Sequence, residues 1–209
     1  YMLSGFFVAH GQELFGLTAG AMMPWVLFYF ISLQRARMFS DVWKTAFFVI
    51  LLLTGGYQAL SIILFYLLLF VFSAQLVYHI IHREYELIKK IIQLNLLLGL
   101  IVLASMTVVA VAWFQGRPYV GRMSGITLGD AWFMPFSPQS LLSLFTPFAT
   151  AGDPGFWNTD ISMNNLYFGI ILVGFAFLGM IRVRKDYTLQ LFLFWGVICL
   201  LAYMGAYTP

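Results

Sequence analysis

The sequence predicts an all-α fold: a polytopic transmembrane helix bundle with one long outer loop that contains a short interfacial helix. Hydrophobic residues make up 62% of the 209 residues and charged residues only 9%, and the mean hydropathy is +0.90. Soluble globular domains carry about 25% charged residues. Apolar runs of about 20 residues, the length that crosses a bilayer as a helix, recur along the chain. These observations indicate a membrane protein.

The apolar runs predict the helices of a single transmembrane domain, 1–209. The run at 42–54 is shorter than the others and is followed by Gly55 and Gly56, so we predict a tight turn and a hairpin with the next span. The first run already begins at Tyr1, and we expect it to be the end of a helix in a longer chain. The predicted spans are 1–9 in part, 13–33, 42–54, 58–80, 91–113, 165–181 and 188–206.

The distribution of basic residues predicts the orientation of the spans. Nine Lys and Arg residues lie on one side of the predicted membrane, and only Arg117 and Arg122 lie on the other. Because short cytoplasmic loops retain basic residues, we predict that the basic side is cytoplasmic and that the long loop 114–164 is on the outer face. The formal net charge of +3 then follows from topology and does not indicate a nucleic-acid-binding patch.

The outer loop 114–164 contains the stretch SPQSLLSLFTPF, which predicts a short helix. Ser137 suits the N-cap position and Pro138 the first helical position. The apolar side chains would gather on one side, so we expect this helix to lie in the membrane interface, with three tryptophans at the same depth. The apolar residues are Leu141, Leu142, Leu144, Phe145 and Phe148, and the tryptophans are Trp113, Trp132 and Trp157.

Ionisable side chains are missing from the centres of the predicted spans. The Asp, Glu, Lys, Arg and His residues all lie near the ends of the apolar runs. Ion-coupled transporters place such groups at mid-depth, so this class is disfavoured. The amides of Gln75, Gln93 and Asn95 are candidates for hydrogen bonds between helices. Any chemistry is therefore expected at the outer interface.

Four residues near the outer face are candidates for catalysis or phosphate binding. His10 and Glu13 lie close together at a predicted turn and could exchange a proton with a substrate hydroxyl or bind a divalent ion. Alternatively, Glu13 favours the start of its helix and His10 is a turn residue. The guanidinium groups of Arg117 and Arg122 match a phosphate at the headgroup level. Alternatively, they pair with lipid headgroups or with loop carboxylates such as Asp130.

The turn-rich stretch ATAGDPGFWNTD, residues 149–160, supplies further candidates. Asp153 and Asp160 could bind a metal or a sugar, and Trp157 between them joins the candidate substrate-binding set. Alternatively, Asp153 forms a turn with the Pro and Gly that follow it, and Asp160 caps a helix. The sequence leaves open whether a divalent metal is the cofactor.

Three stretches resemble the bacterial YfhO membrane-protein family: SGFFVAHGQ (4–12), LTGGYQALSIILFYLLLF (53–70) and SPQSLLSLFTPFATAGDPGFWNTDISMNNLYFGIILV (137–173). The resemblance implies the GT-C group of polytopic glycosyltransferases, which use polyprenyl-phosphate-linked sugars on the outer face of the bacterial cytoplasmic membrane. It also implies that the main acidic catalytic residue lies in an earlier outer loop, before Tyr1. Some members are linked to the glycosylation of lipoteichoic acid or other envelope polymers.

Three functional hypotheses follow from these observations. The first is part of a membrane glycosyltransferase that moves a sugar from a polyprenyl phosphate to a cell-envelope acceptor, surrounded by membrane lipid and without a nucleic-acid partner. The second is a lipid or glycolipid flippase, which predicts polar side chains on facing helices through the bilayer. The third is a non-enzymatic envelope protein.

Overall fold

The computed structural model describes residues 14–55, 58–116, 138–146, 166–167, 169–183 and 186–204. All regular secondary structure in these ranges is helical, which confirms the predicted all-α class. The chain divides into two compact units. The four-helix unit is Phe15–Ser124, and the C-terminal unit combines Tyr1–Leu14 with Gly125–Pro209. A single transmembrane bundle formed by all spans stays a prediction.

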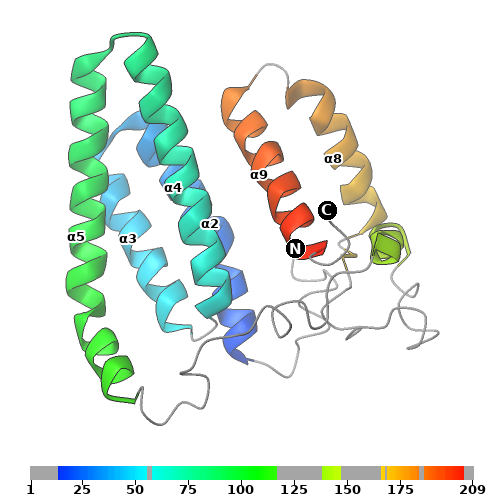
Figure 1. The fold of residues 1–209 in the computed structure, drawn as a ribbon, viewed down its shortest axis with the longest axis horizontal. Helices are drawn as coiled ribbons and strands as arrows, with labels where there is room; N and C mark the ends of the chain where they lie inside the picture. The colour runs from blue at the N-terminus through cyan, green and yellow to red at the C-terminus, as the bar shows by residue number, and fades with distance from the viewer. Residues whose placement is uncertain are drawn as a thin grey trace. The chain divides into compact units, whose positions relative to one another are not determined.

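The four-helix unit is built from long helices in which successive members run antiparallel (Figure 1). The helices are α2 (Leu14–Ala36), α3 (Phe39–Thr54), α4 (Gln58–Ile81) and α5 (Tyr85–Gly116). Buried apolar side chains recur at helical spacing, so each helix turns one narrow stripe toward its neighbours. The buried apolar residues are Ala19, Val26, Phe30 and Leu33 on α2, Val42, Ala46 and Leu52 on α3, Leu64, Leu67 and Val71 on α4, and Ile91 and Leu98 on α5.

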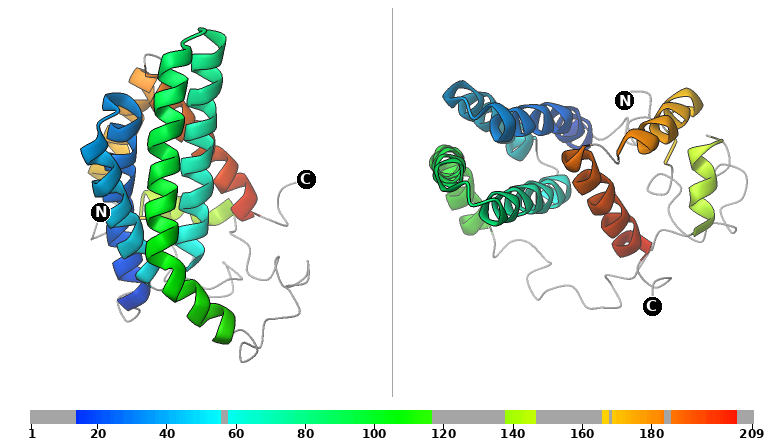
Figure 2. Two further views of the ribbon diagram at one scale, coloured as in Figure 1. Left: turned by 90° about the vertical axis from the view of Figure 1, so that its left-hand side faces the viewer. Right: turned by 90° about the horizontal axis from the view of Figure 1, so that it is seen from above.

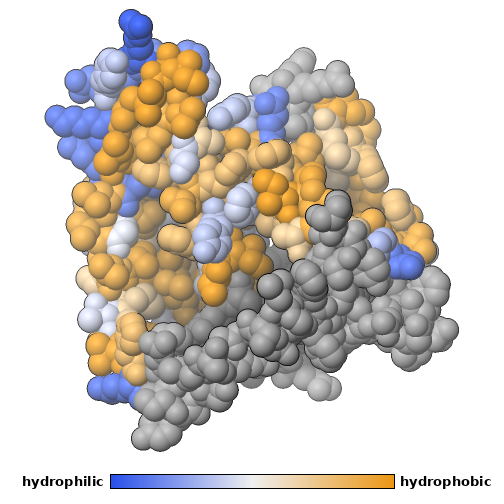
Figure 3. Space-filling model, in the orientation of Figure 1, coloured by the Kyte–Doolittle hydropathy of each residue, from blue (hydrophilic) through white to orange (hydrophobic). Residues whose placement is uncertain are grey.

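Three helices in the described residues are long and apolar enough to cross a membrane. They are Gly16–Ala36, Leu60–Ile81 and Tyr85–Gly116, and they correspond to three of the predicted spans. Figure 3 shows apolar surface along α4 and α5 and hydrophilic surface at the end where these two helices connect. Helices of this length and composition indicate a membrane protein.

Two helices of this unit end in a residue with left-handed backbone conformation. Arg37 follows α2 with φ 55°, and its N–H donates to the Leu33 carbonyl at 3.1 Å. Arg83 follows α4 with φ 58°, and the N–H of Glu84 donates to the His79 carbonyl at 3.0 Å, as in a Schellman motif. Glycine usually occupies this position because it has no Cβ. Both connections instead carry an arginine there.

The α4–α5 connection is shorter than the sequence predicts. The predicted span starts at residue 91, but α5 already begins at Tyr85. The prediction was wrong because it relied on hydropathy, whereas Lys89 and Lys90 are good helix formers and Glu86 in the first turn favours the helix N-terminus. Charged residues therefore form the first turns of a helix that continues into the apolar run.

The last helix of this unit is longer than its partner. α5 has 32 residues and α4 has 24, so α5 is about 12 Å longer. Figure 2 shows the last turns of α5 bending away from the other helices. The hydroxyl of Thr107 donates to the Leu103 carbonyl at 2.9 Å, a bond to the preceding turn that favours helix bending.

The break between α3 and α4 packs closely on α2. α3 ends at Thr54, and Gly55 follows it with an ordinary helical φ of −64°. The hydroxyl of Thr18 donates to the Gly55 carbonyl at 3.3 Å, and a Cβ at Gly55 would lie 3.2 Å from the backbone nitrogen of Ala19. The predicted break after residue 54 is confirmed, and the close approach to α2 explains why glycine suits it.

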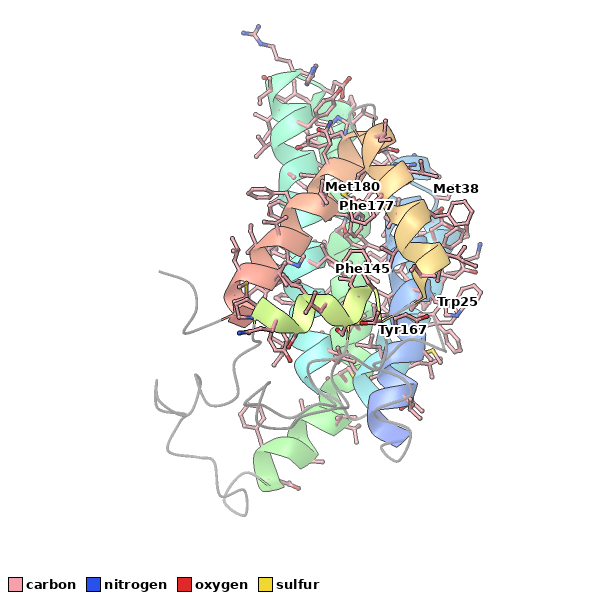
Figure 4. The ribbon with its side chains drawn as sticks, turned by 90° about the vertical axis from the view of Figure 1, so that its right-hand side faces the viewer. Trp25, Met38, Phe145, Tyr167, Phe177 and Met180 are labelled. Atoms are coloured by element: carbon pink, nitrogen blue, oxygen red, sulfur yellow. The ribbon has the colours of Figure 1, made fainter. Side chains whose placement is uncertain are left out.

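The described part of the C-terminal unit contains one 3-10 helix and two apolar α-helices. They are η2 (Pro138–Leu144), α8 (Ile170–Val183) and α9 (Tyr187–Met204). α8 begins five residues later than the predicted span 165–181, because Gly169 has φ 104°, which is incompatible with an α-helix. Figure 4 labels Phe177 and Met180, two exposed side chains of α8.

Candidate functional site

The residues predicted to form the outer site lie outside the described residues. They are His10, Glu13, Arg117, Arg122, Asp153, Trp157 and Asp160. Their catalytic, phosphate-binding and substrate-binding roles stay predictions. The polar side chains that the structure does describe gather at the end of the four-helix unit where α2 joins α3 and α4 joins α5.

We call this group of polar side chains the connection-end cluster. It draws on all four helices of the unit and on both connections. Its members are Ser32 and Gln34 of α2, Arg37 of the α2–α3 connection, Asp41 and Lys44 of α3, His79 of α4, Glu84 of the α4–α5 connection and Asn95 of α5. The cluster therefore ties together segments that are up to 61 residues apart in the sequence.

Asp41 is the buried carboxylate of the connection-end cluster and is only 5% exposed. The hydroxyl of Ser32 donates to Asp41 Oδ2 at 2.7 Å, and Lys44 Nζ lies 3.7 Å from Asp41 Oδ1. Asp41 also lies in the first turn of α3, where the helix dipole favours a negative charge. These interactions offset the cost of burying the carboxylate and join α2 to α3.

Gln34 and Asn95 form a reciprocal amide pair between α2 and α5. Gln34 Nε2 donates to Asn95 Oδ1 at 2.8 Å, and Asn95 Nδ2 donates to Gln34 Oε1 at 3.3 Å. Asn95 Nδ2 also donates to the Ile91 carbonyl at 2.8 Å. Gln34 is 1% exposed, so water does not reach its amide, and the bonds to Asn95 satisfy it instead. The prediction that Asn95 bonds to another helix is confirmed.

Arg37, His79 and Glu84 form a chain of polar contacts across the two connections. Arg37 Nη2 lies 3.4 Å from His79 Nε2, and His79 Nδ1 lies 2.5 Å from Glu84 Oε2. A guanidinium can only donate, so Nε2 must be the acceptor nitrogen of His79. Nδ1 then carries the proton and donates to Glu84, which fixes the tautomer and the orientation of the ring.

Arg37 is the least satisfied cation of the cluster. Its Nε atom is buried and has no hydrogen-bond partner, and its only side-chain contact in the described residues is the one to His79. The two carboxylates of the cluster are already engaged, Asp41 by Ser32 and Lys44, and Glu84 by His79. Neither carboxylate therefore contacts the Arg37 guanidinium directly, and Glu84 is connected to it only through the His79 ring.

The connection-end cluster can hold charge and fix helix positions. Within the described ranges, no three His, Cys, Asp or Glu side chains come together as metal ligands. The sequence prediction did not include Gln34, Asp41 or His79 among the candidate residues. One available signal was that Gln34 lies four residues after the buried Phe30, on the apolar stripe of α2.

The segment predicted as an interfacial helix is a 3-10 helix of seven residues, Pro138–Leu144. It begins at the predicted Pro138, but it is shorter and more tightly wound than the predicted helix. Its polar side is the buried one: Ser140 and Ser143 are fully buried, and the Ser143 hydroxyl accepts from the Leu166 N–H at 2.8 Å. Its apolar side is exposed, at Leu141, Leu142 and Phe145, the last of these labelled in Figure 4.

We expect Ser143→Ala to loosen this segment locally. The substitution removes the acceptor of the Leu166 N–H, a bond worth about 1 kcal/mol. The Leu166 amide hydrogen is expected to exchange several-fold faster, measured by hydrogen–deuterium exchange with mass spectrometry. Thr146→Ala serves as the control, because the Thr146 hydroxyl is exposed and makes only a long, 3.4 Å contact to the Leu142 carbonyl. Equal exchange in both variants would contradict the prediction.

Comparison of the chain with protein-family models, curated proteins and solved structures finds no match in any of the three.

Proposed function

We propose that the chain is the central part of a GT-C-like membrane glycosyltransferase that moves a sugar from a polyprenyl-phosphate donor to a cell-envelope acceptor, such as lipoteichoic acid or another glycopolymer. The observation that most supports it is the exposed apolar side of η2, at Leu141, Leu142 and Phe145. A segment with buried hydroxyls and exposed apolar side chains suits the membrane interface. A lipid-linked donor presents its phosphate at that depth.

The proposed reaction is an inverting displacement at the anomeric carbon of the sugar. The acceptor hydroxyl oxygen forms a bond to that carbon, the bond between the carbon and the phosphate oxygen breaks, and the polyprenyl phosphate leaves. A carboxylate takes the proton of the hydroxyl; the resemblance implies that the main one lies before Tyr1, and we propose that Glu13 and His10 assist it. Arg117 and Arg122 stabilise the charge that develops on the leaving phosphate.

The flippase hypothesis is the alternative and is disfavoured in the four-helix unit. A path for a polar headgroup needs polar or ionisable side chains along the helices at mid-depth. In the described residues of this unit, the Asp, Glu, Lys, Arg and His side chains lie near the connection end of the helices: α4 has none before His79 and α5 has none after Lys90. The buried polar groups gather mainly at one end instead of crossing the unit.

The test uses the intact protein that contains this chain, reconstituted in liposomes. Transfer of radiolabelled sugar from a polyprenyl phosphate to envelope lipid would be measured for wild type, Glu13→Gln, Arg117→Ala and Arg122→Ala. Loss of an assisting carboxylate is expected to lower the rate in Glu13→Gln, by less than the factor of about 100 that loss of a main general base would cost. Arg83→Ala is the control, since it is an exposed arginine of the four-helix unit outside the proposed site. Transport of labelled lipid across the bilayer without consumption of any donor would favour the flippase hypothesis.

A further inference from the structure

We propose that Arg37 binds the phosphate of an anionic phospholipid at the connection end of the four-helix unit. This inference is independent of the proposed transferase activity and concerns the opposite end of α2 from the predicted catalytic residues. It rests on the partial burial of the Arg37 side chain, on the lack of an anion in direct contact with its guanidinium and on the residues that flank it.

Arg37 and Arg83 share a left-handed backbone conformation, so the backbone alone does not distinguish them. A non-glycine residue in this region is uncommon, but it occurs where a helix ends. Arg83 has almost the same φ, 58° against 55° for Arg37, and terminates α4 as Arg37 terminates α2. The two arginines differ in their side chains: Arg83 is exposed, whereas Arg37 is partly buried and held by His79.

No anion contacts the guanidinium of Arg37 directly in the described part of the chain. Its guanidinium is partly desolvated, since Nε is buried without a partner, and a buried cation is costly unless it is paired. His79 accepts one N–H but contributes no negative charge at Nε2. A phosphate is a suitable anion because its oxygens match the planar fork of a guanidinium.

The residues that flank Arg37 favour a lipid over a free phosphate ion. Arg37 directly follows Ala36, the last residue of the first candidate span, which places it at the depth of lipid headgroups. Met38, Phe39 and Trp43 come next and are 57%, 57% and 54% exposed. Figure 4 labels Met38 at this end of the unit. A cation beside exposed apolar side chains matches a molecule with a phosphate and acyl chains.

The α4–α5 hairpin completes the basic environment of this site. Gln34, near the end of α2, is bonded to Asn95 of α5. α5 begins ten residues before Asn95, at Tyr85, so its first turns extend about 15 Å beyond the Gln34–Asn95 pair. Figures 1 and 2 both show the hairpin projecting past the α2–α3 connection. Lys89 and Lys90 on this projecting part are exposed and attract anionic lipid nonspecifically. Arg37 adds a fixed contact to that general attraction.

The test compares two arginines of the full chain in lipid nanodiscs. Binding of phosphatidylglycerol, diluted into phosphatidylcholine, would be measured by native mass spectrometry for wild type, Arg37→Gln and Arg83→Gln. Loss of a forked, charge-assisted contact is expected to weaken binding tenfold or more in Arg37→Gln. Loss of a general surface charge is expected to weaken it no more than about fivefold in Arg83→Gln. Equal losses in the two variants would overturn the proposal.

A second measurement needs no variant and separates the two sources of phosphate. Phenylglyoxal modifies guanidinium groups, and its rate at Arg37 would be read by peptide mass spectrometry with Arg83 as the internal reference. Nanodiscs with phosphatidylglycerol are expected to slow the modification of Arg37 relative to Arg83, compared with pure phosphatidylcholine. Equal protection by inorganic phosphate in phosphatidylcholine nanodiscs would overturn the lipid assignment in favour of a soluble anion, and no protection by either would overturn the site.

Discussion

Replacing Gly55 with leucine is expected to lower the free energy of unfolding of the four-helix unit by about 2 kcal/mol, as overpacking of a close contact does. The first added atom would already lie 3.2 Å from the Ala19 nitrogen and 3.3 Å from the Thr18 hydroxyl. Ala19 is fully buried and its nitrogen belongs to the α2 backbone, so it cannot move aside cheaply. The φ of −64° is ordinary for leucine, so the expected loss comes from the contact with α2 and not from backbone strain.

The matched control for Gly55 is Gly99 in α5. A Cβ at Gly99 would meet nothing within 4 Å, and leucine is a better helix former than glycine by somewhat under 1 kcal/mol. Gly99→Leu is therefore expected to leave the stability unchanged or to raise it. Both variants would be compared by reversible unfolding in mixed detergent micelles. The predicted contact between the α3–α4 break and α2 is wrong if Gly55→Leu unfolds at the same denaturant concentration as Gly99→Leu.

The positions of the helices could be read from the sequence because each is marked by an apolar run. α4 illustrates this, since its predicted span 58–80 differs from Gln58–Ile81 by a single residue. The predicted ends of the helices were less accurate where charged residues, or residues with an unusual backbone conformation, determine where a helix begins. α5 begins in a charged segment that hydropathy excludes, and α8 begins after Gly169, whose positive φ no apolar pattern reveals.

The connection-end cluster was largely beyond sequence reasoning because its bonds join distant segments. A polar residue at a helix end, such as Asp41 or His79, is ordinarily solvated, and only the packing of several helices buries it. Asn95 was identified as a candidate for a bond to another helix, because an amide inside an apolar run needs a partner. Its partner Gln34 lies 61 residues earlier, and hydropathy gives no information about which helices become neighbours.

Replacing Asn95 with leucine is expected to lower the free energy of unfolding by about 1 to 2 kcal/mol. The substitution removes both bonds of the amide pair and leaves the Gln34 amide, 1% exposed, without the partner it has on α5. An unsatisfied buried amide loses its hydration without compensation, so the cost comes mainly from Gln34. Unfolding in mixed micelles would measure the loss.

If the unpaired Gln34 amide causes the lower free energy of unfolding, a second substitution that removes this amide should restore it. The double variant Gln34→Leu with Asn95→Leu removes both amides and replaces them with apolar side chains, so no unpaired amide of this pair stays buried. Most of the lost stability is therefore expected to return. Gln93→Leu is the control for added apolar volume on α5, because Gln93 is exposed and two residues from Asn95. Additive losses in the double variant would instead mean that each amide stabilises the unit on its own, through contacts other than the bond between them.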